Sequence, residues 1–155
     1  MKRIVGLAVF IVVAAIIFGC ASDIILEEPP SLKGVYKGRY IVTIKEGGID
    51  IETKQPIDWK FTDDSYYMYL DPTHPSFIPG ECDFCKVYGR YVVEERVKLT
   101  QTGEGFPFEE LDCQACNNAY SPQGAFTLEQ PEDSVKLTYS SKDTLKEIIL
   151  ERVSE

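Results

Sequence analysis

The fold is decided by the stretch from Cys82 to Thr100, which reads CDFCKVYGRYVVEERVKLT. It holds a CxxC pair, a segment of the form Gly-x-aromatic-x-aliphatic-Glu that starts at Gly89, a turn, and Val-Lys-Leu-Thr. The same order of features returns from Cys113 to Thr138, with Gly124 in the place of Gly89. Alternating apolar and polar residues on both sides of a turn are typical of a β-hairpin. Each unit is therefore predicted to be a CxxC loop that leads into a hairpin.

The two-residue period of a half-buried strand runs through most of the remaining chain. In Gly34–Lys45, for example, Tyr36, Tyr40 and Val42 share one face. Pro56 is expected to break or bulge the strand that contains it. The last segment, Leu145–Val153, also fits a helical stripe, but it is short for a helix and a strand there would close the sheet. The sequence predicts an all-β fold, an antiparallel up-and-down meander of eight or nine strands that closes into a barrel and so hides its edges.

The meander predicts where the four cysteines of the two units lie. Alternate strands run in the same direction, so the loops that lead into the Gly89 and Gly124 strands should meet at one rim of the barrel. Four cysteines that meet there can form two disulfides, with three connectivities open, or a tetrathiolate zinc site. A copper-handling or redox-active pair is a third alternative. The candidate disulfide or metal residues are Cys82, Cys85, Cys113 and Cys116.

The N-terminal segment reads as a targeting signal. Lys2 and Arg3 precede an apolar run from Ile4 to Gly19, which is shorter than the roughly 20 residues of a membrane-spanning helix. The residues Ile17-Phe18-Gly19-Cys20 resemble the lipobox of bacterial lipoproteins, although Phe18 departs from the usual small residue. The resemblance implies a signal peptide over 1–19 and lipidation of Cys20, which would attach the protein to a membrane. Residues 20–33 are then a tether, and 34–155 form the barrel domain.

Composition narrows the possible partners. The 155 residues carry a formal net charge of −9, which becomes about −11 once Lys2 and Arg3 are removed with the signal. A basic nucleic-acid footprint is absent, so no nucleic-acid partner is expected. Attraction to anionic lipid headgroups is not expected either, and membrane attachment would come from the acyl chains on Cys20.

Motifs for catalysis are lacking in the sequence. His74 is the single histidine, and no Gly-x-Ser-x-Gly elbow or phosphate-binding glycine loop is present. His74 is read as an exposed loop residue, with a role as an extra metal ligand as the alternative. The carboxylate pairs, such as Asp63 and Asp64, are read as acidic turns. We therefore expect a protein that is not an enzyme.

The start of the barrel domain carries a second resemblance. Gly34-Val35-Tyr36 is similar to the Gly-x-Trp start of lipocalins, with Tyr36 in the Trp position, and the region from Gly34 to Val153 resembles small lipocalin-like domains of bacterial lipoproteins. The resemblance implies a barrel that binds a small apolar ligand inside, or one that is simply packed. The candidate pocket-lining residues are Tyr36, Tyr40, Trp59, Phe61, Tyr91 and Phe126.

Together these features predict a lipid-anchored lipoprotein of the cell envelope with a non-enzymatic binding or interaction barrel. The alternative is a zinc- or copper-binding envelope protein that uses the CxxC…CxxC site. Ala21 lacks the acidic character of an inner-membrane retention signal, so the periplasmic face of the outer membrane is favoured if the cell is Gram-negative.

Overall fold

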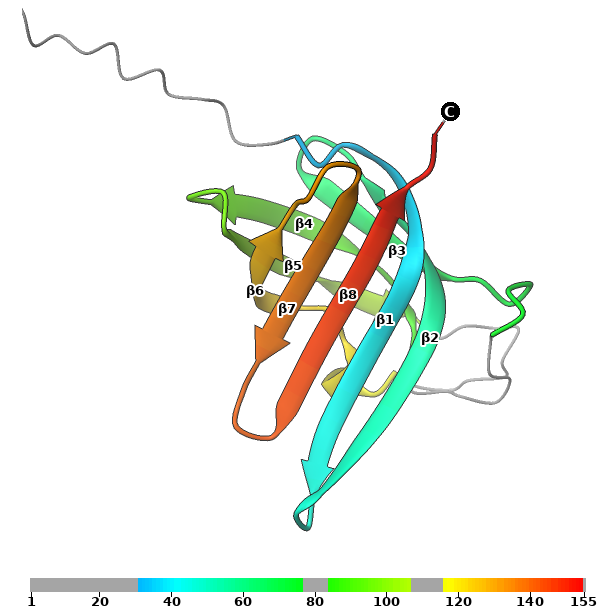
Figure 1. The fold of residues 1–155 in the computed structure, drawn as a ribbon, viewed down its shortest axis with the longest axis vertical. Coiled ribbons are helices and arrows are strands. Elements are labelled where there is room, and N and C mark those ends of the chain that lie inside the picture. The colour runs from blue at the N-terminus through cyan, green and yellow to red at the C-terminus, as the bar shows by residue number, and fades with distance from the viewer. Residues whose placement is uncertain (1–30, 77–83, 107–115, 155) are drawn as a thin grey trace, which may run out of the picture.

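The computed structural model describes residues 31–76, 84–106 and 116–154 and shows a closed barrel of antiparallel strands (Figure 1). Each strand pairs with the next one along the chain, and the last pairs with the first. The predicted all-β meander is thus confirmed, with eight strands. They are β1 (Gly34–Glu46), β2 (Ile49–Phe61), β3 (Ser65–Leu70), β4 (Lys86–Glu94), β5 (Lys98–Phe106), β6 (Gly124–Glu129), β7 (Ser134–Ser140) and β8 (Thr144–Arg152).

Closure depends on β8, the segment whose sequence also fitted a helix. It forms a strand and pairs with β1 over nine positions, from Tyr36↔Arg152 to Ile44↔Thr144. A strand satisfies the hydrogen-bonding edges of both β1 and β7, which a helix of the same residues would leave unpaired. No helix among the described residues is long and apolar enough to cross a membrane.

The two predicted hairpins are present. β4 pairs with β5, with Val93 opposite Leu99, and β6 pairs with β7, with Leu128 opposite Leu137. One boundary differs from the prediction. Val97, the first residue of the predicted Val-Lys-Leu-Thr segment, lies in the β4–β5 turn and is exposed, and β5 runs from Lys98 to Phe106.

The expectation that Pro56 interrupts its strand is wrong, because β2 runs through it from Ile49 to Phe61. The Pro56 carbonyl accepts a hydrogen bond from the Asp71 backbone N–H at 3.4 Å, so this edge of the residue faces the β3 side. The absent N–H would face the same side, just beyond the last β2–β3 pair, Ile57↔Leu70. No hydrogen bond between β1 and β2 is lost, which is why a proline is tolerated there.

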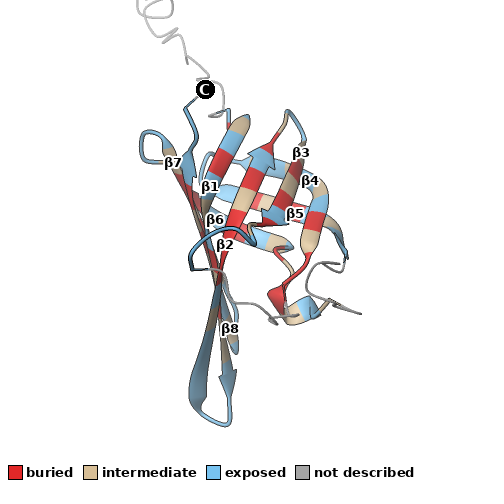
Figure 2. Cartoon of the chain, turned by 90° about the vertical axis from the view of Figure 1, so that its right-hand side faces the viewer, coloured by how far each residue is buried: buried red, intermediate tan, exposed pale blue. Residues whose placement is uncertain are grey.

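The barrel interior is filled mainly by aromatic and aliphatic side chains that alternate along the strands with exposed ones (Figure 2). Leu32 also packs into this core and is 1% exposed. The packed domain therefore begins at least two residues before Gly34, inside the segment expected to be a tether. The other residues of that segment that precede position 31, and Cys20 with its predicted signal, lie outside the described residues.

Glycines allow the strands to approach closely at two places in the barrel wall. A Cβ on Gly38 of β1 would lie 1.9 Å from the Ile149 carbonyl oxygen on β8. A Cβ on Gly89 of β4 would lie 1.8 Å from the Thr102 carbonyl oxygen on β5. Because these oxygens belong to the backbone of the neighbouring strand, no side chain can be accommodated without opening the wall. Such glycines let a sheet bend sharply enough to close.

Candidate functional site

One rim of the barrel is tied by a disulfide between the two predicted loops. Cys85 directly precedes β4, and Cys116 lies just before the short 3₁₀ helix η2 (Asn118–Tyr120). Their sulfurs are 2.08 Å apart, across a sequence separation of 31 residues. The convergence of the two CxxC loops at one rim is thus observed for one cysteine of each pair. The linkage runs between the pairs, and Cys82 and Cys113 lie outside the described residues.

This disulfide bears on the predicted zinc site. A tetrathiolate site needs all four sulfurs as thiolates, and Cys85 and Cys116 are bonded to each other instead. In the ranges that the structure describes, no three His, Cys, Asp or Glu side chains are grouped so that they could hold a metal ion.

Two aromatic side chains close the barrel at the disulfide rim. Phe84, which precedes the bonded Cys85, is fully buried, and Tyr120 of η2 is buried beside it. The Phe84 ring packs edge-on against Tyr40 of β1 at 5.4 Å and against Tyr120 at 5.0 Å. The Tyr120 hydroxyl lies 3.3 Å from Thr53 Oγ1 on β2. We call Phe84 and Tyr120 the rim aromatics. They come from the two segments that the disulfide joins.

A buried lysine holds one of these segments against the barrel. Lys146 follows the inward parity of β8 and is 7% exposed. Its Nζ donates a hydrogen bond to the Ser121 carbonyl oxygen at 2.5 Å and lies 5.3 Å from the centre of the Tyr139 ring. Burial lowers the pKa of Lys146. Its ammonium is thus anchored by a backbone carbonyl and an aromatic face.

The six residues predicted to line a pocket all face the interior. Tyr36, Tyr40, Trp59, Phe61 and Phe126 are buried, and Tyr91 packs half-buried against them. Their rings pack against one another or against neighbouring core rings such as Phe84 and Tyr139. Trp59 stacks on Tyr66 at 5.2 Å, and Phe61 packs edge-on against Tyr36 at 5.8 Å and Tyr91 at 5.0 Å. The structure therefore shows them as a packed core.

Several polar atoms inside this core have no hydrogen-bond partner. They are Tyr40 Oη, Tyr66 Oη, Trp59 Nε1 and both amide atoms of Gln101. All four side chains are at most 1% exposed. We call these four residues the interior polar cluster. Burial raises the pKa values of Tyr66 and of Tyr40. Both hydroxyls are therefore neutral over the physiological range.

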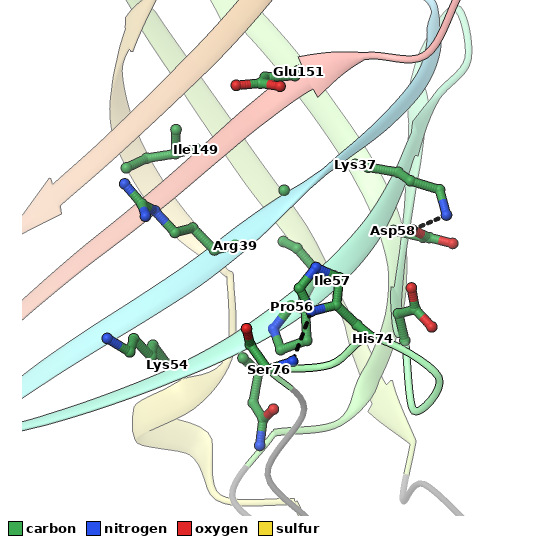
Figure 3. A pocket seen from close by; sticks show the side chains of 13 residues that line it. Lys37, Arg39, Lys54, Pro56, Ile57, Asp58, His74, Ser76, Ile149 and Glu151 are labelled. Atoms are coloured by element: carbon green, nitrogen blue, oxygen red, sulfur yellow. Dashed lines mark hydrogen bonds and ion pairs between the residues drawn. The ribbon is translucent and has the colours of Figure 1, made fainter.

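A groove lies on the outside of the barrel. It has a volume of about 540 Å³ and is formed by the outer faces of β1, β2 and β8 and by the segment after β3 (Figure 3). Its charges are mixed: Lys37 pairs with Asp58 at 3.6 Å, and Arg39 and Glu151 lie nearby. His74 lines this groove, and its Nδ1 accepts a hydrogen bond from the Ser76 backbone N–H at 3.1 Å. In this structure His74 organises a turn.

A second outer surface is aromatic. Tyr67 stacks with Tyr69, and Tyr88 stacks with Phe106, on the outer faces of β3, β4 and β5. The neighbouring Tyr66 points into the core, whereas Tyr67 and Tyr69 point outward.

The sequence did not identify the rim aromatics or the buried polar side chains as interior residues. Phe84 lies between the two cysteines of a CxxC loop, where no alternation signals burial. Lys146 and Gln101 have the parity of inward residues, and this was the available signal for both, but such side chains are usually placed on the surface. Tyr120 lies in a predicted loop and had no signal beyond its aromatic character.

Comparisons with known proteins give no match to a family model, a curated protein or a solved structure. Function must therefore be inferred from the residues and their geometry.

Proposed function

We propose that this chain is an exported, lipid-anchored protein of the cell envelope whose barrel is a non-enzymatic binding module. The observation that carries the proposal is the Cys85–Cys116 disulfide at one rim. Disulfides form and persist in oxidising compartments outside the cytosol. The basic head, the apolar run and the Gly19-Cys20 junction at the start of the chain are the sequence features of export followed by lipidation.

The direction of the strands supports a functional polarity. The chain enters β1 at one end of the barrel, and the segments that carry Cys85 and Cys116 lie at the other end (Figure 1). In a protein anchored through Cys20, the disulfide rim would therefore face away from the membrane. A ligand that enters at this rim would approach from the aqueous side.

Binding is favoured over catalysis by the chemistry of the interior. Among the described residues, the buried polar or charged side chains are Gln55, Gln101 and Lys146, and the rest of the core is aromatic or aliphatic. Neutral hydrogen-bonding groups among aromatic rings suit recognition of a small, largely apolar molecule. The alternative, a zinc or copper site, would require Cys85 and Cys116 in reduced form.

Anchoring is tested by expressing the full chain and the Cys20→Ala variant in a bacterial host with a clickable fatty acid. We expect label and membrane association for the wild type and no label for the variant. Equal labelling of the two chains would reject lipidation at Cys20.

The state of the sulfurs is tested on the same purified protein by thiol titration and metal analysis. We expect no free thiol at Cys85 or Cys116 before reduction, and no bound zinc. Free thiols together with one zinc per chain would reject the disulfide account and favour the metal-binding alternative.

A further inference from the structure

The interior polar cluster is unusual for a packed core. A buried hydrogen-bonding group without a partner costs about 1 to 3 kcal/mol, so natural proteins contain few of them, and each calls for an explanation. Here five unpaired atoms lie on four side chains, and none of these four side chains makes a side-chain hydrogen bond. Phenylalanine and leucine would fill the same space without this cost.

The members of the cluster are buried side chains of four strands, β1, β2, β3 and β5. The Tyr66 ring lies parallel to the Trp59 ring, with an interplanar angle of 10°. Gln101 faces the interior from β5, opposite Tyr91. The four side chains are neutral, and each can donate a hydrogen bond through a hydroxyl, an indole N–H or an amide NH₂ group, whereas the tyrosine hydroxyls and the amide oxygen can accept one.

Phe84 packs against one member of this cluster, Tyr40, from a segment outside the sheet. It belongs to no strand, yet it is 0% exposed and its ring packs edge-on against Tyr40. It contacts the second rim aromatic, Tyr120, in the same way. The Phe84 ring thus fills an aromatic position at the disulfide rim, but it has no polar atom that could form a hydrogen bond with the Tyr40 hydroxyl.

We propose that the Phe84 ring fills the binding position of a ligand, and that this ligand is a small uncharged aromatic molecule with a hydroxyl group that hydrogen-bonds to Tyr40. This inference rests on the proposed binding function and specifies the ligand class. The edge-on contacts of Phe84 select an aromatic ring. The unpaired hydroxyl of Tyr40 selects a hydrogen-bonding substituent. A neutral ligand fits because Lys146, the buried charged side chain of the described core, is already bound to the Ser121 carbonyl.

The test removes the Phe84 ring and offers a small aromatic molecule in its place. The full-length Phe84→Ala chain, in mild detergent, is titrated with phenol and with toluene, which has the same shape but no hydroxyl. Trp59 is the single tryptophan of the chain and stacks on Tyr66, so its fluorescence reports on the site. We expect phenol to bind Phe84→Ala at least tenfold more tightly than the wild type, and about tenfold more tightly than toluene, as one neutral hydrogen bond allows.

Two further variants make the result specific. Phe106→Ala removes an exposed ring on the outer surface and should bind phenol as weakly as the wild type does. Phe84→Ala combined with Tyr40→Phe should lose the preference for phenol over toluene. If near-UV circular dichroism shows that Phe84→Ala does not fold, the preference for phenol over toluene is measured in Phe84→Leu, which leaves free part of the space of the Phe84 ring.

Equal affinities for phenol and toluene, or no binding to a folded variant at position 84, would overturn the inference and leave the cluster as a site for ordered water only. Such a result would not affect anchoring or the state of the sulfurs, which are measured separately. Conversely, loss of lipidation would reject the proposed anchoring without changing the affinity for phenol.

Discussion

Arg152 on the last strand binds Tyr36 on the first: its Nη2 donates a 2.7 Å hydrogen bond to Tyr36 Oη, and its guanidinium lies 5.1 Å from the centre of the Tyr36 ring. Arg152 Nη1 also donates to the Lys33 carbonyl at 2.9 Å. The Tyr36 hydroxyl in turn donates to the Leu32 carbonyl at 2.8 Å. One arginine therefore fastens the entry segment, β1 and β8 at the end of the barrel opposite the disulfide.

Replacing Arg152 by Lys is expected to lower the free energy of unfolding by about 1 to 2 kcal/mol, because a lysine cannot make both hydrogen bonds and stack on Tyr36. Urea denaturation monitored by Trp59 fluorescence measures the change. Lys142→Arg, in the exposed β7–β8 turn, is the matched control and should leave the midpoint unchanged. Equal midpoints for Arg152→Lys and the wild type would contradict a role of Arg152 in closure.

The Cys85–Cys116 disulfide is expected to contribute about 3.7 kcal/mol to stability, because it closes a loop of 31 residues in the unfolded chain. The double variant Cys85→Ala, Cys116→Ala should show this loss in urea denaturation under oxidising conditions. Mass spectrometry of a non-reduced digest should find the Cys85 peptide joined to the Cys116 peptide. A Cys82–Cys85 link within one CxxC motif would refute the pairing.

Gly89→Ala is expected to cost at least about 3 kcal/mol, because the new Cβ would lie 1.8 Å from the Thr102 carbonyl oxygen and the β4–β5 wall would have to open. Gly105→Ala is the control on the neighbouring strand. Its Cβ would meet Cys116 Sγ at 3.4 Å, which is an ordinary contact, so little change is expected. Thermal unfolding compares the two variants, and a similar loss in both would show that the close approach at Gly89 is not the cause.

Tyr66→Phe is expected to stabilise the protein by about 1 kcal/mol or more, because it removes a buried hydroxyl that has no partner. Tyr91→Phe is the opposite case. The Tyr91 hydroxyl donates to the Thr62 carbonyl at 2.7 Å, so its removal should destabilise by about 1 kcal/mol. Chemical denaturation of both variants checks the contrast. A destabilised Tyr66→Phe would mean that the hydroxyl has a partner in solution.

Stability is expected to fall at alkaline pH because burial raises the pKa values of Tyr40 and Tyr66 above the value of about 10 that tyrosine has in an unfolded chain. Above pH 10 the unfolded chain loses these protons while the folded chain keeps them. The stabilising effect is thus complete below pH 10 and is lost as the pH rises toward the raised pKa values, by about 1.4 kcal/mol per pH unit for each tyrosine.

Denaturation curves between pH 8 and 11.5 measure this slope, and absorbance at 295 nm follows the tyrosinates. In Tyr66→Phe the decrease in stability per pH unit should be smaller by the contribution of one tyrosine, about 1.4 kcal/mol. An unchanged slope in this variant would indicate that Tyr66 ionises in the folded state as it does in the unfolded chain.

The sequence was sufficient to predict the meander because inward residues such as Tyr36, Tyr40 and Trp59 keep strict parity, and the repeated unit indicates two hairpins in the same orientation. It also placed two cysteines correctly at one rim, since strand direction alone determines which loops meet. β8 was ambiguous by period and was decided by tertiary context, because β1 and β7 both lacked a partner.

The arrangement of side chains at the disulfide rim could not be predicted in the same way. The burial of Phe84 depends on which cysteines pair, and the sequence left three connectivities open. The inward position of Lys146 depends on a carbonyl at Ser121, which a distant loop brings to it. Pro56 is tolerated because β3 ends where the proline has no N–H to offer, a fact of register that local sequence does not contain.

In a closed barrel each strand has two neighbours, so no strand lies at an edge of the sheet. Because β1 and β8 are neighbours with an antiparallel register, the start of β1 and the end of β8 lie at the same end of the barrel (Figure 1). The β1–β2 turn at Gly47-Gly48 lies exposed at the other end, with nothing within 4 Å of either glycine's would-be side chain. A circularly permuted chain, cut at this turn and joined between Arg152 and Leu32 by a short flexible linker, should therefore assemble the same cylinder.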